Sequence, residues 1–167
     1  MPRHRSPQTP ARAYITAEGA ARLREEMQKL WSVERPRVTA AVSAAAKNGD
    51  RSENGDYTYG KRRLREIDRR VRYLSKRLEY VTIVDQLPRD LTRVYFGAWV
   101  SVADGRGEQA CYRLVGSDEI DPGSGYISID SPMARALLGK GQGDVIEIHQ
   151  DGQRRAWSIV AINYTPR

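Results

Sequence analysis

The chain has one cysteine, two histidines and no long apolar run. A single cysteine, Cys111, cannot form an internal disulfide, which favours a reducing, cytoplasmic setting. The two histidines, His4 and His149, lie far apart in the sequence, so we expect no zinc site built from the usual ligands. No window approaches 18 consecutive apolar residues, so we expect no membrane span. Residues 1–13 are basic, lack the apolar segment of a signal peptide and predict a disordered lead-in.

Positive charge is concentrated in the first half of the chain. The 167 residues carry a formal net charge of +7 and a mean hydropathy of −0.66. Residues 1–90 hold 20 Lys/Arg and 12 Asp/Glu, whereas residues 91–167 hold 8 and 9. The first half therefore favours a polyanionic partner, whereas the nearly neutral second half suits a protein partner better.

Residues 14–87 predict an antiparallel coiled-coil hairpin of two helices. The first helix is expected over 16–47, with Thr16 as N-cap, and its apolar stripe shifts after Pro36, where we expect a bend. Gly, Asn and Asp residues over 47–56 predict the turn between the helices. In the second helix, six apolar residues follow the 3,4 spacing of a heptad seam: Leu64, Ile67, Val71, Leu74, Leu78 and Val81. The alternative is an ordinary amphipathic helix packed on a globular core.

Residues 93–167 predict a small antiparallel α+β domain, joined to the hairpin by a linker over 88–92. Ser131 and Pro132 predict the start of its single helix, as N-cap and first helical residue. Alternating and aromatic-rich segments predict five strands: 94–102, 109–115, 126–129, 145–149 and 157–164.

Three carboxylates, Asp50, Glu53 and Asp56, lie in the turn at the tip of the predicted hairpin. Carboxylates bind hard cations such as Mg²⁺, but two of them in an exposed turn hold the ion poorly alone. We therefore expect any Mg²⁺ to be shared with a metal centre held elsewhere, and not to bind tightly to the free chain. The alternative is that Asp50, Ser52 and Asn54 act only as turn and N-cap residues of the second helix.

The second helix carries the densest positive charge, with nine Lys/Arg and two acidic residues between positions 61 and 77. Tyr57, Tyr59 and Tyr73 are interleaved with the basic residues. Since basic side chains neutralise phosphates and aromatic rings stack on bases, this helix predicts nucleic-acid binding. A solvated coiled-coil face is the alternative, but such faces usually mix the two signs. Five basic residues have the 3,4 spacing of one helix face: Arg62, Arg65, Arg69, Arg72 and Lys76.

Several motifs, in order, resemble those of bacterial transcript cleavage factors of the Gre family. Residues 49–57, GDRSENGDY, resemble the family's GD-x-x-EN-x-[DE]-Y turn, and residues 61–74 resemble its basic second arm. The resemblance covers about residues 14–165. Gly55 departs from the pattern, because the family usually has alanine there, and glycine lowers helix propensity at the tip. Four segments of the second half match as well: 96–100, 113–116, 118–119 and 127–137.

The resemblance implies a cofactor of RNA polymerase and not an independent enzyme. Such factors bind the rim of the polymerase's secondary channel through their C-terminal domain and insert the hairpin into the channel. By this resemblance, Asp50 and Glu53 help to hold a second Mg²⁺ ion at the polymerase's active centre, where the polymerase hydrolyses backtracked RNA. The basic face, with Tyr57, would contact the 3′ segment of the nascent RNA.

The resemblance also implies a fold and a docking surface for the second half. The family's C-terminal domain is similar in fold to FKBP-type prolyl isomerases, which does not by itself imply isomerase activity. The expected polymerase contacts are Asp118, Ser131 and Pro132, and the alternative is that these residues only build a turn and a helix cap. A monomer is expected.

Three other functions stay open. One is a secondary-channel regulator that inhibits or modulates transcription without cleavage, against which the intact pair Asp50 and Glu53 argues. Another is a stand-alone nuclease or a nucleic-acid-binding coiled coil. The third is a prolyl isomerase. RNA cleavage by a backtracked polymerase, with and without the protein, separates the first two from a cleavage factor.

Overall fold

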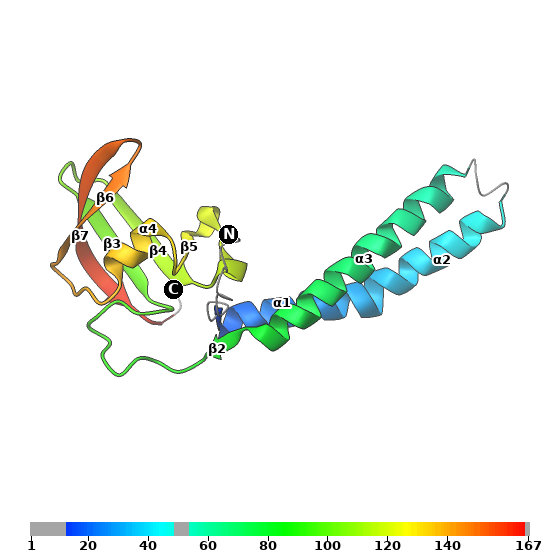
Figure 1. Cartoon of the computed structure of the whole chain (residues 1–167), viewed down its shortest axis with the longest axis horizontal. Helices are drawn as coiled ribbons and strands as arrows, with labels where there is room; N and C mark the ends of the chain where they lie inside the picture. Colours follow the sequence, from blue (N-terminus) through cyan, green and yellow to red (C-terminus); the bar gives the residue numbers. More distant parts are fainter. Residues whose placement is uncertain (1–12, 49–53, 166–167) are drawn as a thin grey trace, which may run out of the picture. The chain divides into compact units, whose positions relative to one another are not determined.

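The computed structural model describes residues 13–48 and 54–165, which divide into two compact units (Figure 1). One unit is Glu18–Val81, and the other contains the described residues before Glu18 together with those after Val81. The expected lead-in lies, except for residue 13, outside the described residues. Within these two described ranges, no helix is both long and apolar enough to cross a membrane.

The first unit is a hairpin of two helical arms. The first arm consists of α1 (Ala17–Lys29), a π-helix (Leu30–Glu34) and α2 (Arg35–Ala46), and the second arm is α3 (Gly55–Tyr80). Figure 1 shows α3 running alongside the first arm. The predicted hairpin and its heptad seam are confirmed: alternate seam residues are buried and the others are half-buried or buried. The buried apolar residues of the two arms are Ala20, Leu23, Leu30, Ala45, Ile67 and Leu74.

The π-helix accounts for the shift in the apolar stripe of the first arm. Leu30 and Val38 are eight positions apart, one more than a heptad, and both are turned toward the interior. In the π-helix the backbone N–H of Arg35 donates to the carbonyl of Leu30, five residues back, so the wide turn holds the additional residue. Pro36, which has no N–H to donate, follows immediately. The irregularity expected at Pro36 therefore takes the form of a π turn just before it.

The second unit contains a five-stranded sheet of order β5-β4-β3-β7-β6 and one helix, α4 (Pro132–Leu137). Ala134 and Leu137 of α4 are fully buried and join the core formed by one face of the sheet, which also contains Val100 and Leu114. The strands of this sheet are β3 (Trp99–Asp104), β4 (Gln109–Val115), β5 (Tyr126–Ser128), β6 (Val145–Gln150) and β7 (Gln153–Asn163).

Two details of this sheet differ from the prediction. The expected all-antiparallel sheet is mixed, because β5 pairs parallel to β4. The connection over 116–125 makes two 3₁₀ turns, at Ser117–Glu119 and Pro122–Ser124, in place of a hairpin. The strand expected from residue 94 begins only at Trp99, since Gly97 has a φ of +84° and ends any extended run there.

Both ends of the hairpin lead into a small parallel sheet that belongs to the second unit. Its strands are β1 (Tyr14–Thr16) and β2 (Thr82–Val84), which we had assigned by sequence to the hairpin over 14–87. The buried carboxylate of Glu119 holds β1 in place. It accepts hydrogen bonds from the backbone N–H groups of Thr16 and Gly116, each at 3.0 Å, and from the Thr16 hydroxyl. The Thr16 side chain, expected as an N-cap, thus contacts Glu119.

Gly116 lies where β1 approaches the end of β4, and we expect Gly116→Ala to destabilise the second unit. A Cβ atom at this position would lie 1.9 Å from the backbone oxygen of Tyr14, which cannot move aside as a side chain can. We expect a loss of about 1–3 kcal/mol in the free energy of unfolding, measured by urea denaturation. Gly105→Ala is the matched control, because its Cβ would meet nothing within 4 Å. Equal stability of the two variants would contradict this account of the β1 contact.

Candidate functional site

The tip of the hairpin is described as far as Asn48 after the first arm and again from Asn54 at the start of α3. Asp50, Glu53 and Ser52 lie outside the described residues. Asn54 is the N-cap of α3: its side-chain oxygen accepts from the backbone N–H of Tyr57 at 3.2 Å, and its amide donates to the carbonyl of Ala45. The N-cap role considered for Asn54 is therefore confirmed, and this side chain ties the start of α3 to the end of α2.

Among residues 13–48 and 54–165, no group of three His, Cys, Asp or Glu side chains could hold a metal ion. Asp56, the third carboxylate of the tip motif, is exposed in the first turn of α3. Its position beside the helix N-terminus suits its negative charge.

Gly55 is the first residue of α3, and we expect Gly55→Ala to stabilise the hairpin. Alanine has the higher helix propensity, and the new Cβ would meet nothing within 4 Å. The expected gain is about 0.5–1 kcal/mol, measured by thermal unfolding followed by circular dichroism. Gly60→Ala in the same helix is the contrast, because its Cβ would lie 2.4 Å from Cγ2 of Val42. A similar gain in both variants would show that backbone propensity alone decides stability here.

The basic residues of α3 separate into two rows with different surroundings. The first, which we call the inner row, is Arg63, Arg70 and Arg77, spaced by seven residues beside the seam. Arg63 donates to Glu34 of the first arm and to Glu66, and these hydrogen bonds raise its pKa. Arg70 donates from two nitrogens to the carboxylate of Glu26, at 2.7 and 3.1 Å. Arg63 and Arg70 of the inner row thus pair the two arms.

Ion pairs between the arms also fix their register. Glu26 and Glu34 are eight residues apart in the first arm, whereas their partners Arg70 and Arg63 are seven residues apart in α3. The π-helix, which ends at Glu34, holds the additional residue of the first arm. On the other side of the seam, Arg35 donates to Asp68 at 2.8 Å, and this hydrogen bond raises the pKa of Arg35. Exposed pairs of this kind add little to the free energy of folding, so their main role is to specify alignment.

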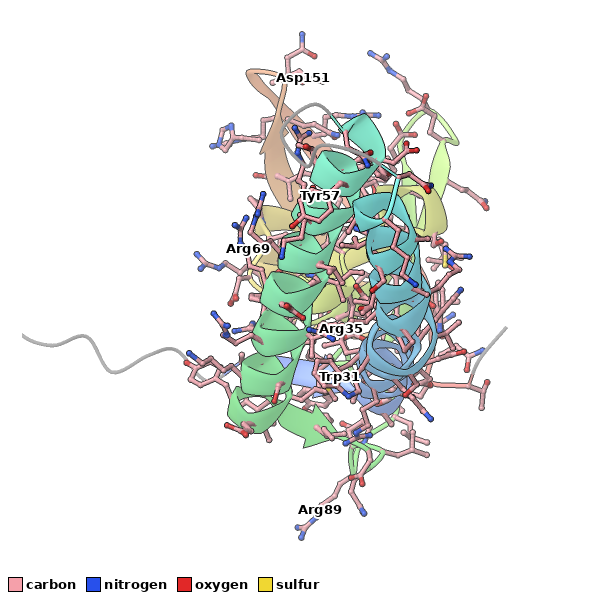
Figure 2. All side chains as sticks on the ribbon, turned by 90° about the vertical axis from the view of Figure 1, so that its right-hand side faces the viewer. Trp31, Arg35, Tyr57, Arg69, Arg89 and Asp151 are labelled. Carbon is pink, nitrogen blue, oxygen red and sulfur yellow. The ribbon has the colours of Figure 1, made fainter. Side chains whose placement is uncertain are left out.

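The second row, which we call the outer row, contains the five basic residues predicted to share one face. All five are exposed, and none forms an ion pair with another residue in the described ranges. Figure 2 shows Arg69 on the side of α3 that faces away from the first arm. The outer row is therefore available to an anionic ligand: Arg62, Arg65, Arg69, Arg72 and Lys76.

The tyrosines do not share the face of the outer row. Tyr57 is half-buried and lies seven residues before Leu64, so it continues the seam at the start of α3. Tyr59, Tyr73 and Tyr80 are exposed and separated by multiples of seven, which places them along a neighbouring face. The guanidinium of Arg70 lies 5.3 Å from the ring centre of Tyr73, a cation–π contact. The structure thus separates Tyr57 from the basic face with which we had grouped it.

The predicted docking residues flank β5 in the second unit. Asp118 is half-buried in the 3₁₀ turn that precedes β5. Ser131 and Pro132 follow β5: the Ser131 hydroxyl accepts from the backbone N–H of Ala134 at 3.3 Å, and Pro132 is exposed as the first residue of α4. The cap role of Ser131 is confirmed, whereas Pro132 leaves an exposed apolar ring beside it. Sequence reasoning missed Glu119, whose burial follows from its contact with a distant strand.

A hairpin with a free row of cations, followed by a small sheet domain, defines a two-part protein suited to one anionic and one protein partner. Residues 13–83 match the family described as "Transcription elongation factor, N-terminal", and residues 89–164 match "Transcription elongation factor, GreA/GreB, C-term". The chain therefore belongs to the GreA/GreB family of transcription elongation factors, as the sequence motifs predict.

Curated relatives match the chain along its whole length. The transcription elongation factor GreB of Pseudomonas aeruginosa is 54% identical over 166 residues, covering 99% of each chain. GreB of Xanthomonas axonopodis pv. citri is 52% identical over 165 residues, covering 98% of each. Both relatives are GreB factors, and the many basic residues of the second arm, between positions 61 and 77, favour GreB over GreA.

Solved structures of the family were also found. The Gfh1 protein of Thermus thermophilus, a GreA factor homologue, is 22% identical with a TM-score of 0.42, covering 92% of this chain and 99% of that one. A GreA/GreB elongation factor from Nitrosomonas europaea is 23% identical with a TM-score of 0.42, covering 92% and 100%.

Proposed function

We propose that this protein is a transcription elongation factor that binds RNA polymerase and stimulates the polymerase's own cleavage of backtracked RNA, rescuing arrested complexes. It acts as a cofactor in the bacterial cytoplasm and supplies no complete active site of its own. Support comes from its membership of the GreA/GreB family over both domains. The observation that carries the proposal is the outer row, whose five cations stay available to RNA while Arg63 and Arg70 are paired across the hairpin.

The tip motif supplies the second part of the proposal. Asp50 and Glu53 offer carboxylate oxygens, the ligands that Mg²⁺ prefers, but two carboxylates are fewer than its octahedral shell requires. This donor set therefore fits an ion shared with the polymerase, whose own ligands complete the shell. Mg²⁺ bound there supplies Lewis-acid stabilisation of the phosphate charge during hydrolysis. The role of the chain is to carry the two carboxylates on a narrow hairpin that enters the secondary channel.

The second unit has the role of docking on the rim of the channel. Its nearly neutral composition suits a protein surface. Asp118 precedes β5 in the chain, and Ser131 and Pro132 follow it. Of these, Pro132 is the better candidate for direct contact, because its ring is exposed whereas the Ser131 hydroxyl is occupied as a helix cap. Docking through this unit leaves the hairpin free to enter the channel.

The test is RNA cleavage in purified polymerase complexes that have been backtracked by a defined length. Adding the protein should shorten the RNA from its 3′ end and allow the complex to resume elongation. Protein incubated with RNA and Mg²⁺ without polymerase is the control for a stand-alone nuclease, and a proline-containing peptide is the control for an isomerase. Binding without faster cleavage would indicate instead a regulator of the channel.

A further inference from the structure

A groove of about 610 Å³ lies between the two arms of the hairpin. Trp31 and Arg35 of the first arm line it, together with Arg72, Ser75 and Lys76 of α3. Figure 2 shows Trp31 and Arg35 in the space between α3 and the first arm. The groove therefore brings Trp31, which is not part of the heptad seam, together with Arg72 and Lys76 of the outer row.

Trp31 is unusually exposed for a residue next to a coiled-coil seam. Its exposed fraction is 55%, whereas its neighbour Leu30 is 9% exposed. The guanidinium of Arg35 lies 5.0 Å from the centre of the indole ring, and Arg35 is itself held by Asp68. The ring is thus oriented by a cation on one side while more than half of its surface stays open to a ligand. Exposed aromatic rings of this kind serve as stacking platforms for nucleobases.

The charges around the groove favour an anionic ligand. Arg35 and Asp68 neutralise each other, and Glu79 is the remaining carboxylate that lines the groove. Arg72 and Lys76 are both exposed and form no ion pair with any residue in the described ranges. Two cations beside one indole match the alternation of phosphate and base in single-stranded nucleic acid.

We propose that this groove binds one nucleotide of single-stranded RNA, with its base stacked on Trp31 and the phosphates on either side of it paired with Arg72 and Lys76. The inference rests on the proposed function and names a binding site within it. Arg72 is 18 residues from the N-cap Asn54, about 27 Å along the helix. Only RNA displaced far from the tip reaches that distance, so Trp31 acts on long extruded segments and not on short ones.

The test is a series of backtracked polymerase complexes with increasing length of extruded RNA. With Trp31→Ala, the polymerase should cleave short extruded segments as fast as with the wild-type protein. Beyond a threshold length, cleavage should be about tenfold slower at limiting protein. Trp31→Phe should retain most of the rate, because it keeps an aromatic ring. Val33→Ala is the matched control, because Val33 is 59% exposed in the same π-helix and does not line the groove.

Two results would overturn the site. Equal loss at every RNA length, with a parallel loss of affinity for polymerase, would mean that Trp31 contacts the polymerase. Wild-type cleavage by Trp31→Ala at all lengths would mean that the groove is not used. If the wild-type protein stimulated no cleavage, the proposed function itself would fail.

A binding measurement tests the groove independently of cleavage. An oligouridine added to the isolated protein should quench the fluorescence of Trp31, and Trp31→Phe should remove this quenching although Trp99 and Trp157 are still present. Quenching that is unchanged in Trp31→Phe would contradict stacking on Trp31.

Discussion

Asp50→Asn and Glu53→Gln should each abolish the stimulation of RNA cleavage and leave binding to polymerase nearly unchanged. Each substitution keeps the size of the side chain and removes the negative charge that makes it a ligand for Mg²⁺. Charge stabilisation by a metal ion contributes several kcal/mol to such reactions, so the expected loss is about hundredfold or more, or about 3 kcal/mol. The proposed docking residues are in the other unit, so affinity should be retained.

The measurement is the single-turnover rate of RNA cleavage in a backtracked complex, with affinity determined separately by competition. Glu25→Gln is the control, because Glu25 is exposed on α1 and undergoes the same change of charge. The rate with each tip variant should also need more Mg²⁺ to reach its plateau. Full stimulation of cleavage by both tip variants would contradict the assignment of the carboxylates as Mg²⁺ ligands. A loss of cleavage that only follows weaker binding to polymerase would assign the two residues to docking.

Local patterns in the sequence predict the hairpin because its stability depends on contacts that repeat along one helix. The seam from Leu64 to Val81 needs only the spacing of apolar residues, and that spacing is visible in the sequence. The π-helix, unlike the seam, could not be predicted from the spacing of apolar residues. The eight-residue step from Leu30 to Val38 shows that the stripe shifts, but whether a bend or a wide turn absorbs it depends on packing against α3.

The errors in the second unit arise from contacts between distant residues. Residues 94–98 have the composition of a strand, yet the backbone turns there and the N–H of Gly97 donates to the carbonyl of Leu114. The parallel pairing of β5 with β4 is likewise decided by the two 3₁₀ turns between them. Nothing in the sequence near Glu119 indicates its bonds to Thr16, which is 103 residues away.

In the candidate site, features that depend on one helix were predicted, whereas features that need a second helix were not. The spacing of the outer row predicts its common face correctly, because five residues on one helix share a face whatever the partner is. The pairing of Arg63 with Glu34 and of Arg70 with Glu26 depends on a second helix and could not be read from the charge count. Trp31 was missed for a similar reason, since its groove exists only between the two arms.

Charge reversal of the outer row should slow the cleavage of long extruded RNA more than that of short RNA. In the variant R65E/R69E/R72E, three cations that form no ion pairs with described residues become anions, so few contacts within the hairpin are lost. On the proposed path, RNA close to the tip does not reach this face, whereas a longer extruded segment would lie along it. We expect a loss of about one to two orders of magnitude for long segments and little change for short ones.

Salt and a matched variant identify the cause of this loss. The wild-type preference for long segments should weaken as salt rises, with a slope in log–log form of about −0.7 per phosphate contacted, and the triple variant should show a smaller slope. Reversing Arg24, Lys29 and Arg37 on the first arm makes the same change in net charge on exposed positions. If both triple variants lose cleavage equally, or if short and long RNA are affected alike, the whole charge of the hairpin matters and the outer row is not a track for RNA.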